Sequence, residues 1–220
     1  GYIDTSQMGS GKTFIAYLVS LYFNLPLLVV CPNGACPNWI DGMMEYGIPH
    51  FGVISYSKLS GRRNCKLSHD LLERCDYVNE QNHNKKQFTV TQKFNDIINK
   101  GALVIFDEVH LNKNNNTGAH MACAALMNAI RSSKSKFGFL SGTIADSHDS
   151  LISIMKLAGI ILQNELYSNY FGREVINKGL DDVIKFASEC DYEKTAKIVT
   201  EFKKRKMNVT NSKNFVTKLY

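Results

Sequence analysis

A short stretch near the start of the chain constrains its fold and chemistry more than any other feature. Its residues, which precede an apolar run from 14 to 23, are Met8, Gly9, Ser10, Gly11, Lys12 and Thr13. The glycines permit a turn in which several backbone N–H groups converge, and a helix that starts here adds the positive end of its dipole. Such a concave site suits an anion. The stretch therefore predicts a phosphate-binding loop that leads into a helix.

Two side chains of this loop have the chemistry that a nucleotide and its metal ion require. Lys12 supplies a compact positive charge for the β- and γ-phosphates, and the Thr13 hydroxyl is placed to bind Mg²⁺. The strict pattern for such loops has a glycine where this chain has Ser6. Taken alone, the loop leaves open a glycine-rich helix start with a chance Gly-Lys-Thr sequence.

A second stretch supports the nucleotide interpretation. Residues 102–106 are wholly apolar, as in a strand buried on both faces, and Asp107 and Glu108 follow directly. Ligands of open α/β sheets bind beyond the carboxyl ends of the strands, which is where these carboxylates lie. Asp107 can hold Mg²⁺, and Glu108 can orient and deprotonate an attacking water. The alternative is an acidic strand end that faces only solvent.

The apolar runs predict a mostly parallel sheet with helices on both faces. Strands are expected at 27–31, 51–55, 102–106 and 136–140. A helix at 12–23 between two strands makes a βαβ unit, which requires parallel pairing. Because this helix is apolar on all sides, we expect it to be largely covered.

Composition limits the remaining possibilities. The 220 residues are 44% hydrophobic and carry a net charge of +6, which mildly favours a polyanionic partner. Six cysteines without a C-x-x-C pair favour a reducing, intracellular compartment over a disulfide framework. No stretch is long and apolar enough to predict a membrane span. The first residue is Gly1 and not Met, so we expect a piece of a longer protein.

The segment from Lys58 to about Gln92 is charged and rich in amides. We interpret it as a solvated insertion in preference to a nucleic-acid contact surface, because charged loops are usually surface. A possible metal cluster within it consists of Cys65, His69, Cys75 and His83. Their spacing matches no established zinc pattern, so we disfavour zinc.

Five motifs in this order resemble the first, ATP-binding lobe of superfamily 2 helicase-type motors, and more narrowly of the Swi/Snf-type branch. The matching segments are residues 1–13, Leu28-Val-Val-Cys-Pro32 with Asn38-Trp39, Ile54-Ser55-Tyr56 with Leu59, Asp107-Glu-Val-His110, and Leu140-Ser-Gly-Thr143. The chain departs from the branch at Ser6-Gln7, where an acidic pair is usual, and at Ile144, where proline is usual.

The resemblance covers about residues 1–158 and implies a RecA-like P-loop domain with three α/β/α layers that uses ATP and Mg²⁺. We expect residues 159–220 to form a mainly helical extension or linker. The family also implies a second RecA-like lobe of the same parent chain, which supplies a catalytic arginine. Virus-encoded transcription ATPases of the poxvirus type share this motor, and the asparagine-rich composition is compatible with a viral source.

The resemblance also implies roles for residues beyond the nucleotide. His110, Ser141 and Thr143 would relay the state of the γ-phosphate to the nucleic acid and to the second lobe. The nucleic-acid backbone would be contacted, mostly without regard to sequence, by Pro32, Asn33, Ser55 and Tyr56.

The leading hypothesis is a nucleic-acid-dependent ATPase that translocates on or remodels duplex DNA. An RNA helicase of the Asp-Glu-x-His type is the alternative within the same class, and the Asn38-Trp39 helix argues against it weakly. From another class, a module that binds ATP without useful turnover remains open. Intact Lys12, Thr13, Asp107 and Glu108 argue against a degenerate site.

Overall fold

The computed structural model describes residues 1–7, 9–61, 66–78, 84–112, 114, 117–142, 148–160, 184–185, 187–189 and 191–203. The chain divides into two compact units, Gly1–Ile144 and Ala145–Tyr220, which are described separately. The helix over 148–158 belongs to the second unit by this division. The expected domain boundary at residue 158 stays a prediction.

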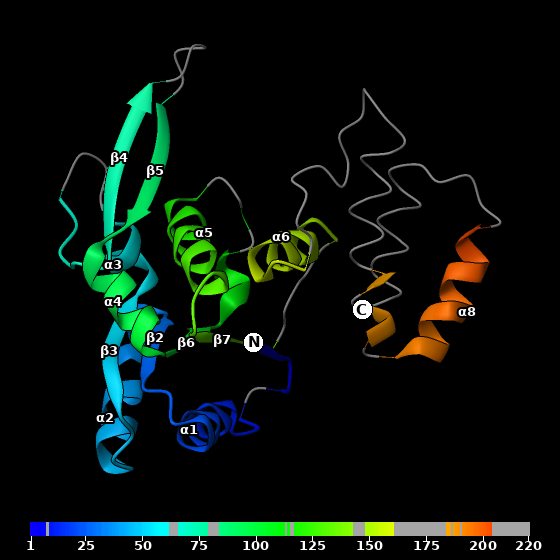
Figure 1. The fold of residues 1–220 in the computed structure, drawn as a ribbon, viewed down its shortest axis with the longest axis horizontal. Helices are drawn as coiled ribbons and strands as arrows, with labels where there is room; N and C mark the ends of the chain where they lie inside the picture. Colours follow the sequence, from blue (N-terminus) through cyan, green and yellow to red (C-terminus); the bar gives the residue numbers. More distant parts are fainter. Residues whose placement is uncertain are drawn as a thin grey trace. The chain divides into compact units, whose positions relative to one another are not determined.

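The first unit is built on a parallel sheet of five strands (Figure 1). They are β1 (Tyr2–Asp4), β2 (Leu27–Cys31), β3 (His50–Ser55), β6 (Leu103–Asp107) and β7 (Lys136–Leu140). Their order is β1-β7-β6-β2-β3, and every neighbouring pair is parallel. All of β2 and the first four residues of β6 are buried, which explains why both are uninterrupted apolar runs. The predicted parallel sheet is confirmed.

Helices cover both faces of this sheet. On one face lie α1 (Lys12–Phe23) and α2 (Cys36–Glu45), where Tyr17, Trp39 and Ile105 belong to one buried cluster. The remaining helical elements of the unit are α3 (Tyr56–Ser60), α4 (Gln92–Lys100), α5 (Gly118–Arg131) and the 3-10 turns η1 (Asn33–Ala35) and η2 (Val109–Asn112). In Figure 1, α4 and α5 lie on the opposite side of the sheet from α1. This is a RecA-like α/β fold in three layers, as the sequence predicts.

The segment expected as a solvated insertion contains an antiparallel ribbon, β4 (Leu72–Val78) and β5 (Asn84–Val90). Arg74 lies directly opposite Phe88, with its guanidinium 5.7 Å from the centre of that ring. Leu72 and Phe88 are buried, so the base of the ribbon has an apolar face. This apolar face is hard to recognise in the sequence, because only every second residue of a strand contributes to it and charged or amide residues stand at the positions between.

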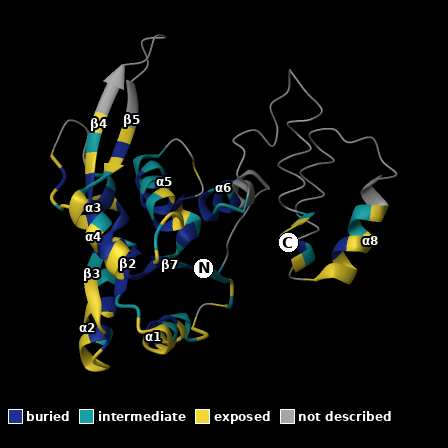
Figure 2. Ribbon diagram, viewed as in Figure 1, coloured by how far each residue is buried: buried dark blue, intermediate teal, exposed yellow. Residues whose placement is uncertain are grey.

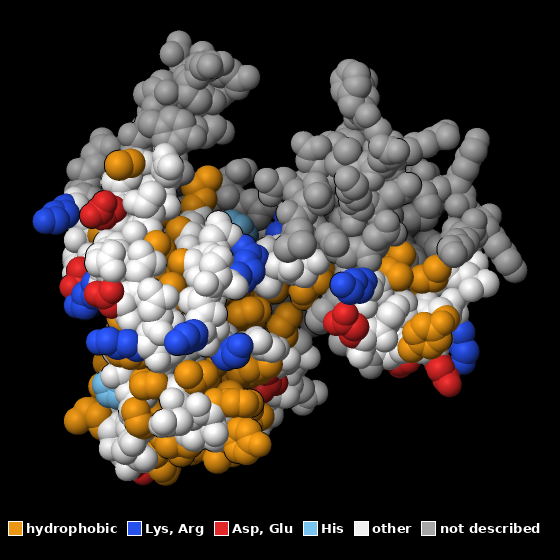
Figure 3. Space-filling model, viewed as in Figure 1, with side chains coloured by type: hydrophobic (Ala, Val, Ile, Leu, Met, Phe, Trp, Pro, Cys, Tyr) orange, Lys and Arg blue, Asp and Glu red, His pale blue; other side chains and the backbone are white. Residues whose placement is uncertain are grey.

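Helix α1 is less covered than its sequence predicts, and that expectation is wrong. Only Ala16, Tyr17 and Ser20 of this helix are buried. Leu18 is 66% exposed and Tyr22 is 83% exposed. Figure 2 shows exposed residues along α1, and Figure 3 shows hydrophobic side chains gathered on this part of the surface. The sheet covers one side of α1, and no other described element of the unit covers the opposite side.

The described elements of the second unit are helical. They include α6 (His148–Ala158) and α8 (Tyr192–Lys203). Ile154, Met155 and Leu157 give α6 a buried face. Across the described part of both units, no helix has the length and hydropathy needed to span a membrane.

Candidate nucleotide-binding site

The loop between β1 and α1 has the backbone conformation that its glycines permit. Gly9 and Gly11 have φ angles of +81° and +89°, in the left-handed region that side chains disfavour. Gly11 is also the N-cap of α1, and it has no side chain that could cover the first N–H groups of the helix. These donors therefore stay directed toward the loop, which favours an anion at this end of α1.

Lys12 is folded back onto the loop that precedes it. Its ammonium donates hydrogen bonds to the carbonyl oxygens of Ser6, at 2.7 Å, and Gln7, at 2.9 Å. The positive charge is thus held among the loop residues and not extended into solvent. Phosphate oxygens entering the loop would be acceptors of the same kind with a full negative charge, and hence stronger partners for the ammonium.

A chain of short polar contacts braces the same loop. The Asp4 carboxylate accepts hydrogen bonds from the Ser6 backbone N–H, at 2.9 Å, and from the Ser6 hydroxyl, at 2.5 Å. The Ser6 and Ser10 hydroxyls are 2.7 Å apart. Ser6, which replaces the usual glycine, therefore ties the start of the loop to its middle. Sequence reasoning missed this brace, although an Asp-x-Ser turn is a recognisable local signal.

The register of the sheet brings the loop and the acidic pair to one edge. Asp4 at the end of β1 and Asp107 at the end of β6 both pair with Leu140 of β7, from opposite sides. Neighbouring strands are about 4.8 Å apart, so the two backbone positions are about 10 Å apart at the same level. Because the three strands are parallel, their carboxyl ends leave the sheet at this edge. The structure thus places Lys12 and Thr13, which follow β1, and Asp107 and Glu108, which end β6, at one edge of the sheet on either side of the exit of β7.

Asp107 is anchored from the opposite side of the site by two aromatic residues. The Trp39 indole N–H donates to its Oδ2 at 2.8 Å, and the Tyr56 hydroxyl donates to its backbone carbonyl at 2.7 Å. Within the described residues, Oδ1 accepts no hydrogen bond from the protein. One carboxylate oxygen is therefore fixed in orientation, while the other remains available as a metal ligand.

Glu108 and His110 link the ends of β6 and β7. Glu108 has a φ of +50°, which is uncommon for a residue with a long side chain and turns the chain sharply after Asp107. Nδ1 of His110 lies 3.1 Å from the Glu108 carboxylate and 2.8 Å from the Ser141 hydroxyl. The Ser141 backbone N–H donates to the Asp4 carbonyl at 3.0 Å. His110 and Ser141 therefore connect the acidic pair to the strand that carries the glycine loop.

The residues predicted to contact nucleic acid divide into two groups. Asn33 is exposed and Pro32 is half-buried at the end of β2. Ser55 is fully buried and caps α3 through its hydroxyl, and Tyr56 is 7% exposed. Burial and these internal hydrogen bonds leave the Ser55 and Tyr56 side chains little surface to offer a nucleic-acid backbone. A nucleic-acid contact through Ser55 or Tyr56 stays a prediction.

Two predicted residues, Met8 and Thr143, lie outside the described residues, as do Cys65 and His83 of the possible metal cluster. His69 of that cluster is fully engaged, because its Nδ1 accepts from the Leu71 N–H and its Nε2 lies 3.0 Å from the Leu59 carbonyl. No cluster of three or more metal-ligating side chains occurs in the described ranges.

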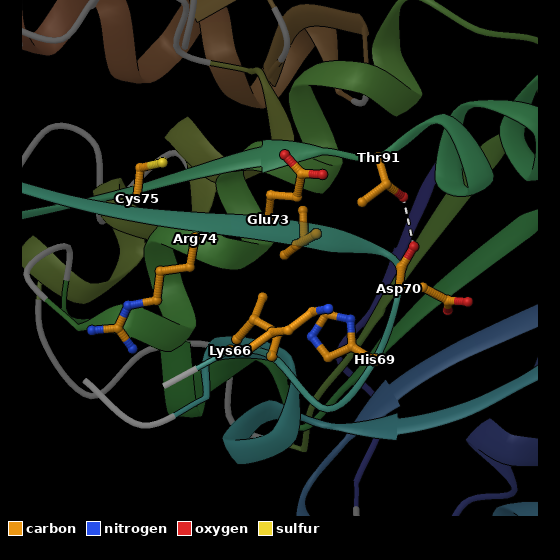
Figure 4. A pocket seen from close by; sticks show the side chains of 9 residues that line it. Lys66, His69, Asp70, Glu73, Arg74, Cys75 and Thr91 are labelled. Carbon is orange, nitrogen blue, oxygen red and sulfur yellow. Dashed lines mark hydrogen bonds between the residues drawn. The ribbon is translucent and has the colours of Figure 1, made fainter. Parts of the chain in front are cut away.

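A cavity of about 400 Å³ lies beside β4, and its lining includes none of the residues predicted to bind nucleotide or nucleic acid. Figure 4 shows its polar lining, including Asp70, Arg74 and Thr91. These groups are engaged within the protein: Thr91 donates to the Asp70 carbonyl, and Arg74 donates to the Ser60 carbonyl. The lining therefore indicates a local structural junction and no particular ligand.

The comparisons with known proteins give a distant relationship. No family model matches the chain. A protein of Acanthamoeba polyphaga mimivirus that carries the name "Putative ATP-dependent RNA helicase" is 27% identical over 116 residues. The match covers 52% of this chain and 21% of that protein, so it spans about a fifth of the relative's length. The chain is therefore similar, over half of its length, to part of a protein named as a helicase, and this similarity does not distinguish the Swi/Snf branch.

Proposed function

We propose that this chain is the first RecA-like lobe of a superfamily 2 helicase-type ATPase. In this proposal ATP hydrolysis depends on nucleic acid and drives translocation on, or remodelling of, duplex DNA. The main support is the shared sheet edge, where the glycine loop, Ser141 and the pair Asp107 and Glu108 leave three adjacent parallel strands. The similarity to a helicase-named protein supports the same class independently.

The residues at this edge fit a nucleotide with Mg²⁺. Lys12 and the loop N–H groups would hold the β- and γ-phosphates. To do so, the Lys12 ammonium would give up its hydrogen bonds to the Ser6 and Gln7 carbonyls and donate to phosphate oxygens instead. The Thr13 hydroxyl and the available oxygen of Asp107 would hold the metal ion. Mg²⁺, when bound, supplies positive charge to the phosphate oxygens that become more negative during transfer.

Glu108 would act as the general base that orients and deprotonates the attacking water. Its carboxylate is near His110, which in turn contacts Ser141. A change in the charge or position of Glu108 would thus alter the hydrogen bonding of His110 and Ser141. With Thr143, these two residues would pass the nucleotide state to the nucleic acid and to a second RecA-like lobe of the parent protein.

The contact with nucleic acid would use Pro32 and Asn33 at the exit of β2. Cys31 at the end of β2 pairs with Ser55 at the end of β3, so the two strands end side by side. Both ends lie on the same edge of the sheet as the proposed nucleotide residues. Backbone and polar contacts there would be independent of base sequence. An RNA track is the second candidate, because the mimivirus relative is named as an RNA helicase.

Two substitutions in the full-length protein test the assignment. Lys12→Ala removes the phosphate-binding charge, and Glu108→Gln removes the base while keeping its shape. Each should lower nucleic-acid-stimulated phosphate release by about a hundredfold or more. Lys100→Ala and Glu45→Gln, which remove the same charges from exposed helix ends, should leave turnover unchanged. Normal turnover in both site variants would refute the proposal.

The same assay separates the two tracks. Duplex DNA and single-stranded RNA are compared as stimulators of phosphate release by the unmodified protein. Stronger stimulation by duplex DNA is the expected result, and stimulation by RNA alone would replace the DNA proposal with the RNA helicase. If ATP binds but neither nucleic acid stimulates hydrolysis, the chain belongs to an ATP-binding module without motor activity.

A further inference from the structure

A pair of cysteine thiols lies at the exit of β2, next to the proposed nucleotide site. The sulfur atoms of Cys31 and Cys36 are 3.5 Å apart. Cys31 is the last residue of β2 and is fully buried. Cys36 is the first residue of α2 and is only half-buried. The proposed mechanism does not use this pair, and its spacing, with four residues between the cysteines, differs from that of a C-x-x-C motif.

The short connection between the two cysteines makes their approach a property of the fold. Pro32 and η1 reverse the chain between β2 and α2, and the Cys36 sulfur also lies 3.7 Å from the Pro32 carbonyl. A disulfide requires the sulfur atoms to approach to about 2.05 Å. The two sulfur atoms must therefore come about 1.5 Å closer, and the first turn of α2, where Cys36 is only half-buried, is the part that would move.

We propose that Cys31 and Cys36 are a site of reversible disulfide formation that responds to peroxides. Formation of the disulfide itself does not depend on the proposed ATPase function. The disulfide would also affect Trp39, because Trp39 lies on α2 three residues after Cys36. Since Trp39 donates to Asp107, movement of the first turn of α2 alters the hydrogen bond that orients this carboxylate. Any effect on ATP turnover rests on the proposed function.

The reaction requires a peroxide and two thiols. The partly exposed Cys36 attacks one oxygen of hydrogen peroxide, so that an S–O bond forms, the O–O bond breaks and the departing oxygen leaves as water. Cys31 then attacks the Cys36 sulfur, the S–S bond forms and the S–O bond breaks, and the hydroxyl leaves with the Cys31 proton as a second water. Both sulfur atoms are oxidised and the peroxide is reduced. Burial raises the pKa of the Cys31 thiol, so Cys36 is the first to react.

Mass spectrometry of the full chain tests the proposal directly. The protein is treated with hydrogen peroxide, alkylated and digested with trypsin. Residues 13–58 form one tryptic peptide that contains no cysteine other than Cys31 and Cys36. We expect this peptide to lose two hydrogens and to escape alkylation, and to regain both alkylation sites after reduction. The proposal is overturned if Cys31 and Cys36 are both alkylated under conditions that oxidise the exposed Cys75.

Two variants and an optical signal make the test specific. Cys36→Ser should leave Cys31 open to alkylation after unfolding, whereas Cys75→Ser should not change the outcome for the peptide. Trp39 is the single tryptophan of the chain, so its emission reports on the first turn of α2. We expect peroxide to change this emission reversibly in the unmodified protein and not in Cys36→Ser. An unchanged emission together with a complete disulfide would overturn the link to Asp107.

Discussion

Two buried tyrosines, Tyr56 and Tyr17, differ in whether the side-chain hydroxyl has a hydrogen-bond partner. The Tyr56 hydroxyl donates to the Asp107 carbonyl, whereas the Tyr17 hydroxyl has no hydrogen-bond partner among the described residues. Burial raises the pKa of Tyr56, so its hydroxyl stays protonated and remains a donor. A buried hydroxyl without a partner loses its hydration and gains nothing in return.

We therefore predict opposite outcomes for two matched substitutions. Tyr56→Phe should lower the free energy of unfolding by about 1 kcal/mol, because it leaves the Asp107 carbonyl without its donor. Tyr17→Phe should leave the free energy unchanged or raise it slightly. Urea unfolding followed by circular dichroism measures both. Equal losses in the two variants would contradict the assigned role of the Tyr56 hydroxyl.

A buried histidine predicts how stability depends on pH. His120 of α5 has its Nδ1 2.6 Å from the Asn112 carbonyl, and burial lowers its pKa from the usual 6.5. As the pH falls through about 6.5, His120 therefore becomes protonated in the unfolded chain while it stays neutral in the folded chain. The contribution of neutral His120 to the free energy of unfolding is fully present above pH 6.5. It should decline as the pH falls from 6.5 toward the lower pKa of His120 in the folded state. The urea midpoint of His120→Gln should fall less over this range, and an identical fall would exclude His120 as the cause.

Some site residues could be predicted from local sequence and others could not. Lys12 and Asp107 lie in patterns that need only a few neighbouring residues. The contact of Trp39 with Asp107 joins residues 68 positions apart and depends on how α2 packs on the sheet. The burial of Ser55 and Tyr56 has the same origin, since a hydroxyl in the sequence does not reveal whether it faces solvent or a strand end.

At the scale of elements, the burial of α1 differs most from what its sequence predicts. A helix that is apolar on all sides is expected to be buried, because period and composition cannot show how many neighbours surround it. Four of the five strands could be predicted in outline from apolar runs of suitable length, whereas β1 (Tyr2–Asp4) is too short to give such a run. The ribbon of β4 and β5 could not, because charged residues interrupt the alternation that marks a half-buried strand.

The exposed side of α1 leads to a prediction about its surface. Leu18→Gln combined with Tyr22→Gln should change the free energy of unfolding by no more than about 0.5 kcal/mol, since both side chains are exposed. The same pair should reduce the fluorescence of a hydrophobic dye that binds apolar patches. Ala16→Gln, at a fully buried position of the same helix, is the destabilising control. A loss of several kcal/mol in the double variant would show that this side of α1 is covered.

At the scale of the whole molecule, ligand binding should stabilise the first unit. Binding to the folded state alone adds about 2.7 kcal/mol when the free ligand is about 100 times its Kd. We expect ATP with Mg²⁺ to raise the midpoint of thermal unfolding, and a chelator to remove much of the shift. Thr13→Ala should reduce the dependence on Mg²⁺, because it removes a proposed metal ligand.

A matched threonine provides the control for this measurement. Thr200 lies on α8 in the second unit, and its hydroxyl donates to the Ala196 carbonyl. Thr200→Ala should leave the dependence on Mg²⁺ unchanged. If Thr13→Ala and Thr200→Ala respond identically to the chelator, Thr13 is not a ligand of the metal ion.

The position of β7 has a consequence for how this protein tolerates change. Ser141 is held on one side by the Asp4 carbonyl and contacts His110 on the other. An inserted residue directly after β7 would therefore displace both neighbouring strand exits together, although neither neighbour had been altered.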